Sequence, residues 1–179
     1  LKASIMRVGN LQGRIRDGEF QMNMKTNAFT RQMSSYVRMG AAPESVCRSA
    51  ANFSPVDDVA RMIVELCGIR CGLTAFHVYP PEEIPYAEMF RTLNDLGIPV
   101  RTVDDAAFEE MLRDYRKTEE GKKIIEGLLM ERPDIHWKMT DTDNSLTLEV
   151  LHQCHQEWTP ASEAYLKQYF SILRDMEMF

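Results

Sequence analysis

The chain begins with a short apolar run that ends at a glycine-rich turn. Leu1 to Val8 has the nearly continuous apolar character of a strand buried on both faces, and Gly9, Asn10 and Gly13 follow it. In open α/β sheets, ligands bind at the carboxyl ends of the strands. We therefore expect a buried parallel strand here, with a ligand-facing turn at its end. Because nothing precedes this strand to pair with it, we interpret Leu1 as lying inside a longer domain.

Helical and extended patterns alternate through the first part of the chain, and the remainder is helical. Apolar spacing predicts helices over 27–39 and 86–96 and around Val59, the last capped by Asp57 or Ser54. Runs of β-branched and aromatic residues predict two further strands, and apolar periodicity predicts four later helices. These strands are expected over 73–79 and 100–103, and the helices over 105–115, 119–130, 145–155 and 160–175.

Two or three strands are too few for a complete doubly wound sheet. We predict an α/β, predominantly helical fold that forms the C-terminal part of a larger Rossmann-like domain and lacks its cofactor-binding half. Residues 1–103 would be the residual α/β part, and residues 104–179 a helical substrate-binding subdomain.

Composition excludes several classes of function. A net charge of -6 with dispersed basic residues argues against a nucleic-acid partner, and no apolar stretch reaches the roughly 20 residues of a membrane span. The four cysteines include no CxxC pair, which fits a reducing cytoplasm and indicates neither a disulfide framework nor a metal site. His152 and His155 are three residues apart, but no carboxylate clearly completes a metal-binding set.

Several segments resemble one known family along nearly the whole chain. The stretch Arg7-Val8-Gly9-Asn10-Leu11-Gln12-Gly13-Arg14 and the later Asp17-Gly18-Glu19-Phe20-Gln21 resemble the region after the sixth strand of the thioester reductase domains that end nonribosomal peptide synthetases, which are extended short-chain dehydrogenase/reductases. Phe53 to Ala60 and Ala75 to Tyr79 are similar to later strand and helix segments of that family. The tail from Asn144 to Leu166 resembles its helical end.

The resemblance implies an NADPH-dependent reduction of the thioester that joins a finished peptide to its carrier protein, with release of an aldehyde or an alcohol. By position, Val8, Gly9, Asn10 and Leu11 match the family's turn beside the nicotinamide and the substrate. The partner implied is a peptidyl carrier protein with a phosphopantetheine-linked peptide.

The catalytic motifs of that family do not occur in this sequence. None of the tyrosines has a lysine four residues later, and there is no GxxGxxG turn to hold a pyrophosphate. We therefore assign no catalytic residue within the chain and expect that, by itself, it neither binds NADPH nor reduces a thioester.

Each candidate substrate-binding residue has a structural alternative. Asn10 could orient a carbonyl through its amide or simply close a turn. Arg14, with Arg16, could attract the phosphates of pantetheine or NADPH or form a solvated surface. Phe20 and Asn23 belong to an alternating segment that could line an acyl channel or pack in the core.

Two functions of different kinds fit these observations. The chain could be the substrate-binding part of a thioester reductase, or a non-catalytic module derived from one that interacts with a carrier protein. In either case an uncovered strand at residues 3–8 is expected to drive self-association of the isolated chain.

Overall fold

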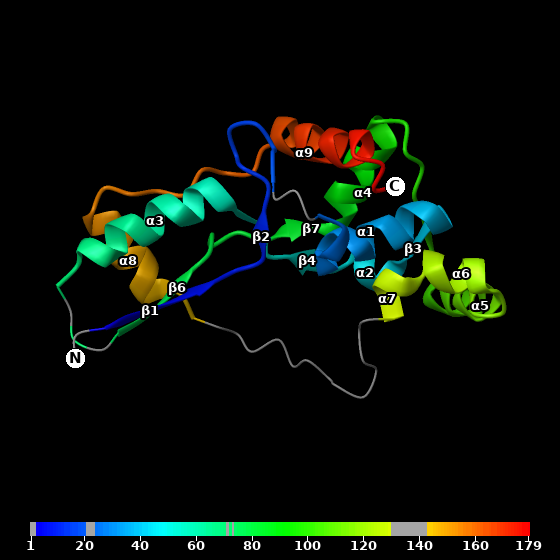
Figure 1. Ribbon diagram of the computed structural model, residues 1–179, viewed down its shortest axis with the longest axis horizontal. Coiled ribbons are helices and arrows are strands. Elements are labelled where there is room, and N and C mark those ends of the chain that lie inside the picture. Colours follow the sequence, from blue (N-terminus) through cyan, green and yellow to red (C-terminus); the bar gives the residue numbers. More distant parts are fainter. Residues whose placement is uncertain (1–2, 21–23, 71, 73, 130–142) are drawn as a thin grey trace.

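The computed structural model describes residues 3–20, 24–70, 72, 74–129 and 143–179 (Figure 1). Helices dominate the described part of the chain. They are η1 Met24–Thr26, α1 Ala28–Met39, α2 Glu44–Cys47, α3 Val56–Gly68, α4 Tyr86–Asp95, α5 Asp105–Tyr115, α6 Glu119–Ile124, α7 Glu126–Leu129, α8 Ser145–Gln153 and α9 Glu163–Asp175. The strands are β1 Ser4–Val8, β2 Leu11–Gln12, β3 Ala41–Pro43, β4 Ala50–Ala51, β5 Ser54–Pro55, β6 Thr74–Val78, β7 Ile84–Pro85 and β8 Arg101–Val103.

Among the described residues the strands pair two by two. β1 pairs with β6, β2 with β5 and β3 with β8 in parallel, whereas β4 and β7 are antiparallel. The β1–β6 register matches Ser4 with Thr74 and Val8 with Val78, so these strands end side by side. The predicted α/β, mainly helical class is confirmed. The strands expected over 3–8, 73–79 and 100–103 are observed as β1, β6 and β8, and the other described strands are two or three residues long.

Two hydrophobic cores lie at opposite ends of the elongated molecule. The smaller core joins β6, α3 and α8 through buried side chains that include Met62, Phe76 and Leu151. The larger core joins α1, α4, α5 and α9 around Met33, Leu93 and Tyr169. Figure 1 shows β1, β6, α3 and α8 at one end and the remaining helices at the other. Both cores draw side chains from each side of residue 103, and the division into two subdomains at that residue remains a prediction.

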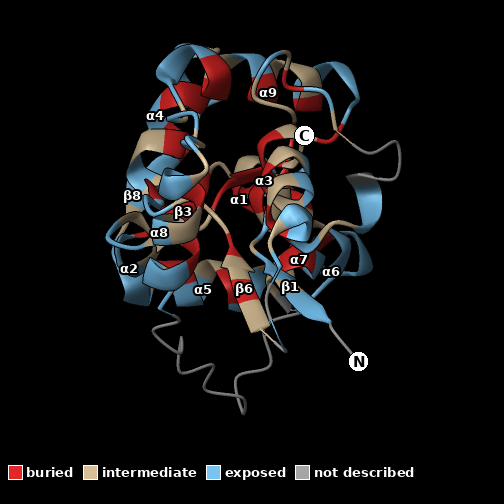
Figure 2. Ribbon diagram, turned by 90° about the vertical axis from the view of Figure 1, so that its left-hand side faces the viewer, coloured by how far each residue is buried: buried red, intermediate tan, exposed pale blue. Residues whose placement is uncertain are grey.

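The first strand is more exposed than its sequence suggests. The strand is paired with β6, but Ile5 is 48% and Val8 43% exposed. In Figure 2 most of β1 has the colour of exposed residues. Burial on both faces is expected within a longer domain. In this chain the strand is partly uncovered, in line with the expectation of an uncovered strand over residues 3–8. The physical reason for this exposure is that no other described strand lies along the outer edge of β1. Of the two helices at this end of the molecule, α8 packs on β6, whereas α3 contacts both strands.

Helix boundaries agree with local capping signals in most places. Asn27 accepts a hydrogen bond from the Thr30 amide at the start of α1, and Gly40 ends that helix with φ 64°. The predicted cap of α3 is wrong, because Pro55 occupies the N-cap position and makes no side-chain cap bond. Asp57 instead accepts a hydrogen bond from the Ile15 amide at 2.8 Å, so tertiary structure uses that carboxylate elsewhere.

The helix predicted over 119–130 is divided into α6 and α7 around Ile125, which is fully buried in the larger core. No helix in the described ranges is long and apolar enough to cross a membrane.

Candidate functional site

The turn after β1 is held by backbone hydrogen bonds to two neighbouring segments. The Gly9 amide donates to the Val78 carbonyl at 3.3 Å, at the matched ends of β1 and β6. The Asn10 amide donates to Asn52 Oδ1 at 3.0 Å, and the Asn10 carbonyl accepts from the Ser54 amide at 3.0 Å. The Ser54 hydroxyl bonds to the same Asn52 oxygen at 2.7 Å. The main chain of Asn10 is thus fixed on both sides, while its side chain is exposed.

The packing of this turn requires glycine at position 9. A Cβ added to Gly9 would clash with Asn52 Oδ1, with Ser54 Oγ at 2.5 Å and with Tyr79 Cβ at 2.7 Å. Asn10, by contrast, is not among the described non-glycine residues with positive φ. Tolerance of an unusual backbone conformation therefore does not account for asparagine at position 10.

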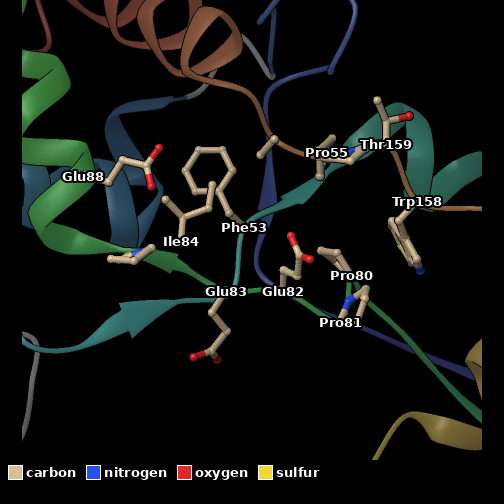
Figure 3. Close-up of a pocket in the computed structure, with 13 residues that line it drawn as sticks. Phe53, Pro55, Pro80, Pro81, Glu82, Glu83, Ile84, Glu88, Trp158 and Thr159 are labelled. Carbon is tan, nitrogen blue, oxygen red and sulfur yellow. The ribbon is translucent and has the colours of Figure 1, made fainter.

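A cavity of about 200 Å³ lies where β6 ends, next to the turn. Pro80 directly follows Tyr79, and Phe53 lies between Asn52 and Ser54, so the cavity and the turn share the same segments. The other described lining residues are Pro55, Pro81, Glu82, Glu83, Ile84, Pro85, Glu88, Trp158, Thr159, Pro160 and Ala161. In Figure 3 the carboxylates of Glu82 and Glu88 extend toward the ring of Phe53, and that of Glu83 extends away from it. Aromatic rings and proline form an apolar wall with carboxylates at its rim, a surface suited to an acyl chain.

A buried carboxylate holds the Trp158 wall of the cavity against α3. Asp58 is 4% exposed; its Oδ2 accepts from the Thr159 amide at 2.8 Å and its Oδ1 from Arg61 at 2.8 Å. Arg61 also donates to the Glu157 carbonyl at 2.9 Å. The segment before α9 is therefore fixed by charge-assisted hydrogen bonds rather than by regular secondary structure.

Two tyrosines of α9 bind the segment that follows the turn. The Tyr165 hydroxyl donates to the Gly13 carbonyl at 2.6 Å, and the Tyr169 hydroxyl donates to Gln12 Oε1 at 2.6 Å. Burial raises the pKa of both phenols well above the ordinary value. Both hydroxyls therefore stay protonated and act as structural donors at neutral pH.

The predicted site residues fall into two groups. Val8, Gly9, Asn10 and Leu11 lie together on the turn, with Val8 and Asn10 exposed and Leu11 packed against the smaller core. Asn23 lies outside the described residues.

Arg14 and Phe20 lie away from the cavity. Arg14 makes ion pairs with Asp17, at 2.8 Å, and with Glu19, which close the loop over 14–19. Phe20 packs against the larger core. Neither is among the described residues that line the cavity. Their assignment to substrate binding remains a prediction; in the structure Arg14 stabilises a loop through ion pairs and Phe20 packs against the core.

Sequence reasoning missed the cavity itself. Its walls come from three distant segments, around Phe53, over 80–88 and over 158–161. The Pro80-Pro81 pair and Trp158 before Thr159-Pro160 were visible as loop signals, but no local pattern places them side by side. In the described parts of the chain, no group of three or more His, Cys, Asp or Glu residues is arranged to hold a metal ion.

The fold of this chain is similar to parts of several solved structures. A thiolation–reductase di-domain from an archaeal non-ribosomal peptide synthetase matches 99% of the chain with a TM-score of 0.85 and 29% sequence identity. The chain has the fold of part of a synthetase-terminal reductase domain. The terminal R domain of the myxalamid PKS-NRPS pathway matches 98% of the chain (TM-score 0.79, 21% identity), and the reductase domain of the aureusimine biosynthetic cluster matches 97% (TM-score 0.78, 22% identity).

This match confirms the resemblance to terminal reductase domains drawn from the sequence. The chain spans only 37%, 44% and 45% of the length of these three reductase structures, respectively. No protein-family model matches the chain, and no curated protein matches it in sequence.

Proposed function

We propose that this chain is the substrate-binding part of an NADPH-dependent thioester reductase that releases a peptide from its carrier protein as an aldehyde or alcohol. The observation that carries this proposal is the match to the archaeal thiolation–reductase di-domain over 99% of the chain. The fixed turn at the end of β1 and the adjacent cavity support it, because they lie where an open α/β sheet binds its ligands.

The residues of the turn suit contact with a nicotinamide and a reacting carbonyl. Val8 offers an exposed apolar side chain, and Asn10 offers an exposed amide on a main chain held by Asn52 and Ser54. NADPH, when bound, supplies the hydride. The pyrophosphate would be held by residues outside this chain, because the 179 residues contain no glycine-rich phosphate turn.

The proposed reaction requires the chain to orient one carbonyl group. Hydride adds to the carbonyl carbon of the thioester, the carbon–sulfur bond breaks, and the pantetheine thiol leaves with a proton, which yields an aldehyde. A second hydride addition gives the alcohol. The Asn10 amide would donate to the carbonyl oxygen as negative charge develops there, and the Phe53–Trp158 cavity would hold the acyl chain and exclude water from it.

A chimaera tests this assignment. Residues 1–179 would replace the matching part of the archaeal reductase, and carrier-bound thioester reduction would be followed by NADPH absorbance. We expect turnover that depends on both NADPH and the thioester. A folded chimaera that binds NADPH but does not reduce the thioester would instead favour a non-catalytic interaction module.

A further inference from the structure

A second cavity, of about 230 Å³, lies between α1, the α6–α7 segment and the end of the chain. Its described lining includes four basic side chains, from Lys25, Arg31, Arg38 and Lys123, and two acidic ones, from Glu126 and Glu177. The lining therefore carries more positive than negative side chains, whereas the whole chain carries a net charge of -6. We refer to this concavity as the basic cavity.

One face of α1 supplies the centre of the basic cavity. Arg31, Ser34 and Arg38 are spaced by three and four residues, so their side chains share a helix face. Guanidinium, ammonium and hydroxyl donors together are the groups that bind phosphate oxygens in proteins. The spacing gives the cavity a row of donors about two helical turns long.

Most of these cations are free to bind an anion. Arg31 is paired with Glu126 at 2.7 Å, but no ion pair joins Lys25, Arg38 or Lys123 to another described residue, and all three are exposed. Arg14, which sequence reasoning offered as a phosphate ligand, is occupied by Asp17 and Glu19, and Arg16 by Asp17. Among the described residues, the basic cavity therefore offers a phosphate more unpaired cations than the loop over 14–19 does.

The first turn of α1 connects the basic cavity to the candidate site. Phe29 makes an edge-to-face contact with Phe53 at 5.6 Å between ring centroids, and Phe53 lines the cavity at the end of β6. Arg31, in the same helical turn, begins the basic face. An anion held by α1 would thus lie on the same helix that packs against the wall of the acyl cavity.

We propose that the basic cavity binds the phosphate of the carrier protein's phosphopantetheine arm. This inference rests on the proposed function and adds to it the surface at which the carrier engages the chain. Lys25, Arg38 and Lys123 provide the attraction, and Ser34 provides a neutral donor. Because these charges are exposed, the interaction weakens as ionic strength rises.

The test compares two ligands that differ only in the phosphate. The isolated chain is titrated calorimetrically with 4′-phosphopantetheine and with pantetheine, and then with holo and apo forms of the thiolation domain from the archaeal di-domain. We expect the phosphorylated ligand and the holo domain to bind more tightly. The double variant Arg38→Glu/Lys123→Glu should bind the phosphorylated ligand and the holo domain about tenfold or more weakly than wild type. This difference between variant and wild type should become smaller at high salt. The control is Arg70→Glu, which reverses the charge of an exposed residue just after α3. Because α3 lies at the other end of the molecule, this variant should bind like wild type.

Each other outcome overturns part of the idea. Equal binding of pantetheine and phosphopantetheine, or equal loss in Arg70→Glu, would show that the phosphate or the location is wrong. If inorganic phosphate competes fully and holo and apo domains bind alike, the cavity is a general anion site. Undiminished holo-domain binding by the double variant would reject the basic cavity but keep the carrier as partner. No binding to the wild-type chain would reject both.

Discussion

The side chain of Asn10 is the residue-scale test of the candidate site. In a polypeptide that joins a cofactor-binding half to these residues, Asn10→Ala should lower the reduction rate by roughly tenfold or more, because one donor to the developing oxyanion is lost. Thermal stability should change little, since the hydrogen bonds of this turn use the Asn10 backbone. Gly9→Ala is the contrasting variant, which should lower stability as well through its clash with Asn52 and Ser54. Wild-type turnover in Asn10→Ala would contradict the assigned role.

The buried phenol of Tyr165 predicts a stability effect with a defined pH dependence. Tyr165→Phe leaves the Gly13 carbonyl without its donor and should reduce the free energy of unfolding by about 1–3 kcal/mol. Because burial raises the folded-state pKa of Tyr165 and Tyr169, their contribution is complete below the unfolded value of about 10 and declines as pH rises above it.

Urea unfolding at several pH values between neutral and strongly alkaline measures this dependence. The wild-type chain should lose stability above pH ~10, and Tyr165→Phe should lose less over the same interval, because one of the two buried phenols has been removed. Parallel curves for the two proteins would show that ionisation of Tyr165 does not limit alkaline stability.

At the scale of elements, the close crossing of α1 and α7 depends on one glycine. A Cβ on Gly127 would clash with the Arg31 carbonyl and meet the Gln32 amide nitrogen at 2.8 Å, all backbone atoms that cannot yield easily. Gly127→Ala should therefore destabilise the chain by about 1–3 kcal/mol through overpacking. Gly68→Ala, at the open end of α3 with nothing within 4 Å, is the matched control and should be neutral or slightly stabilising. Equal melting temperatures in the two variants would show that α7 can move away from α1 at little cost.

The exposed first strand affects the behaviour of the whole molecule. β1 is bonded to β6 along one edge, and its other edge faces no described strand, with Ile5 48% exposed. Such an edge readily adds another strand. The isolated chain should therefore self-associate at micromolar concentration, most simply as a symmetric dimer that buries residues 1–13.

Sedimentation velocity tests this association. Ile5→Lys should shift the chain toward monomer, whereas Val64→Lys, at an apolar residue of α3 that is 71% exposed, should leave the association unchanged. A wild-type chain that stays monomeric, or equal effects of both substitutions, would show that β1 is not the contact surface.

The sequence by itself determined the local elements, because their signals lie within a few residues. The helix predicted over 105–115 is observed as Asp105–Tyr115, with Asp104 accepting a hydrogen bond from the Ala107 amide. Asn27 and Gly40 bound α1 as expected. The family resemblance, carried mainly by the residues around Gly9 and Asn10, also indicated the fold correctly, since that turn is specific in sequence.

Only the tertiary structure decided which surfaces are covered and which distant groups meet. The apolar run of β1 indicated burial, but burial depends on what packs against a strand, and here no described strand covers the outer edge of β1. Asp57 had the local signature of a cap, yet it bonds to Ile15, 42 residues away. The acyl cavity and the basic cavity each combine segments distant in sequence, so the periodicity of no single segment predicts them. Capping and periodicity act over one or two turns of chain, whereas a cavity exists only where separate elements pack together.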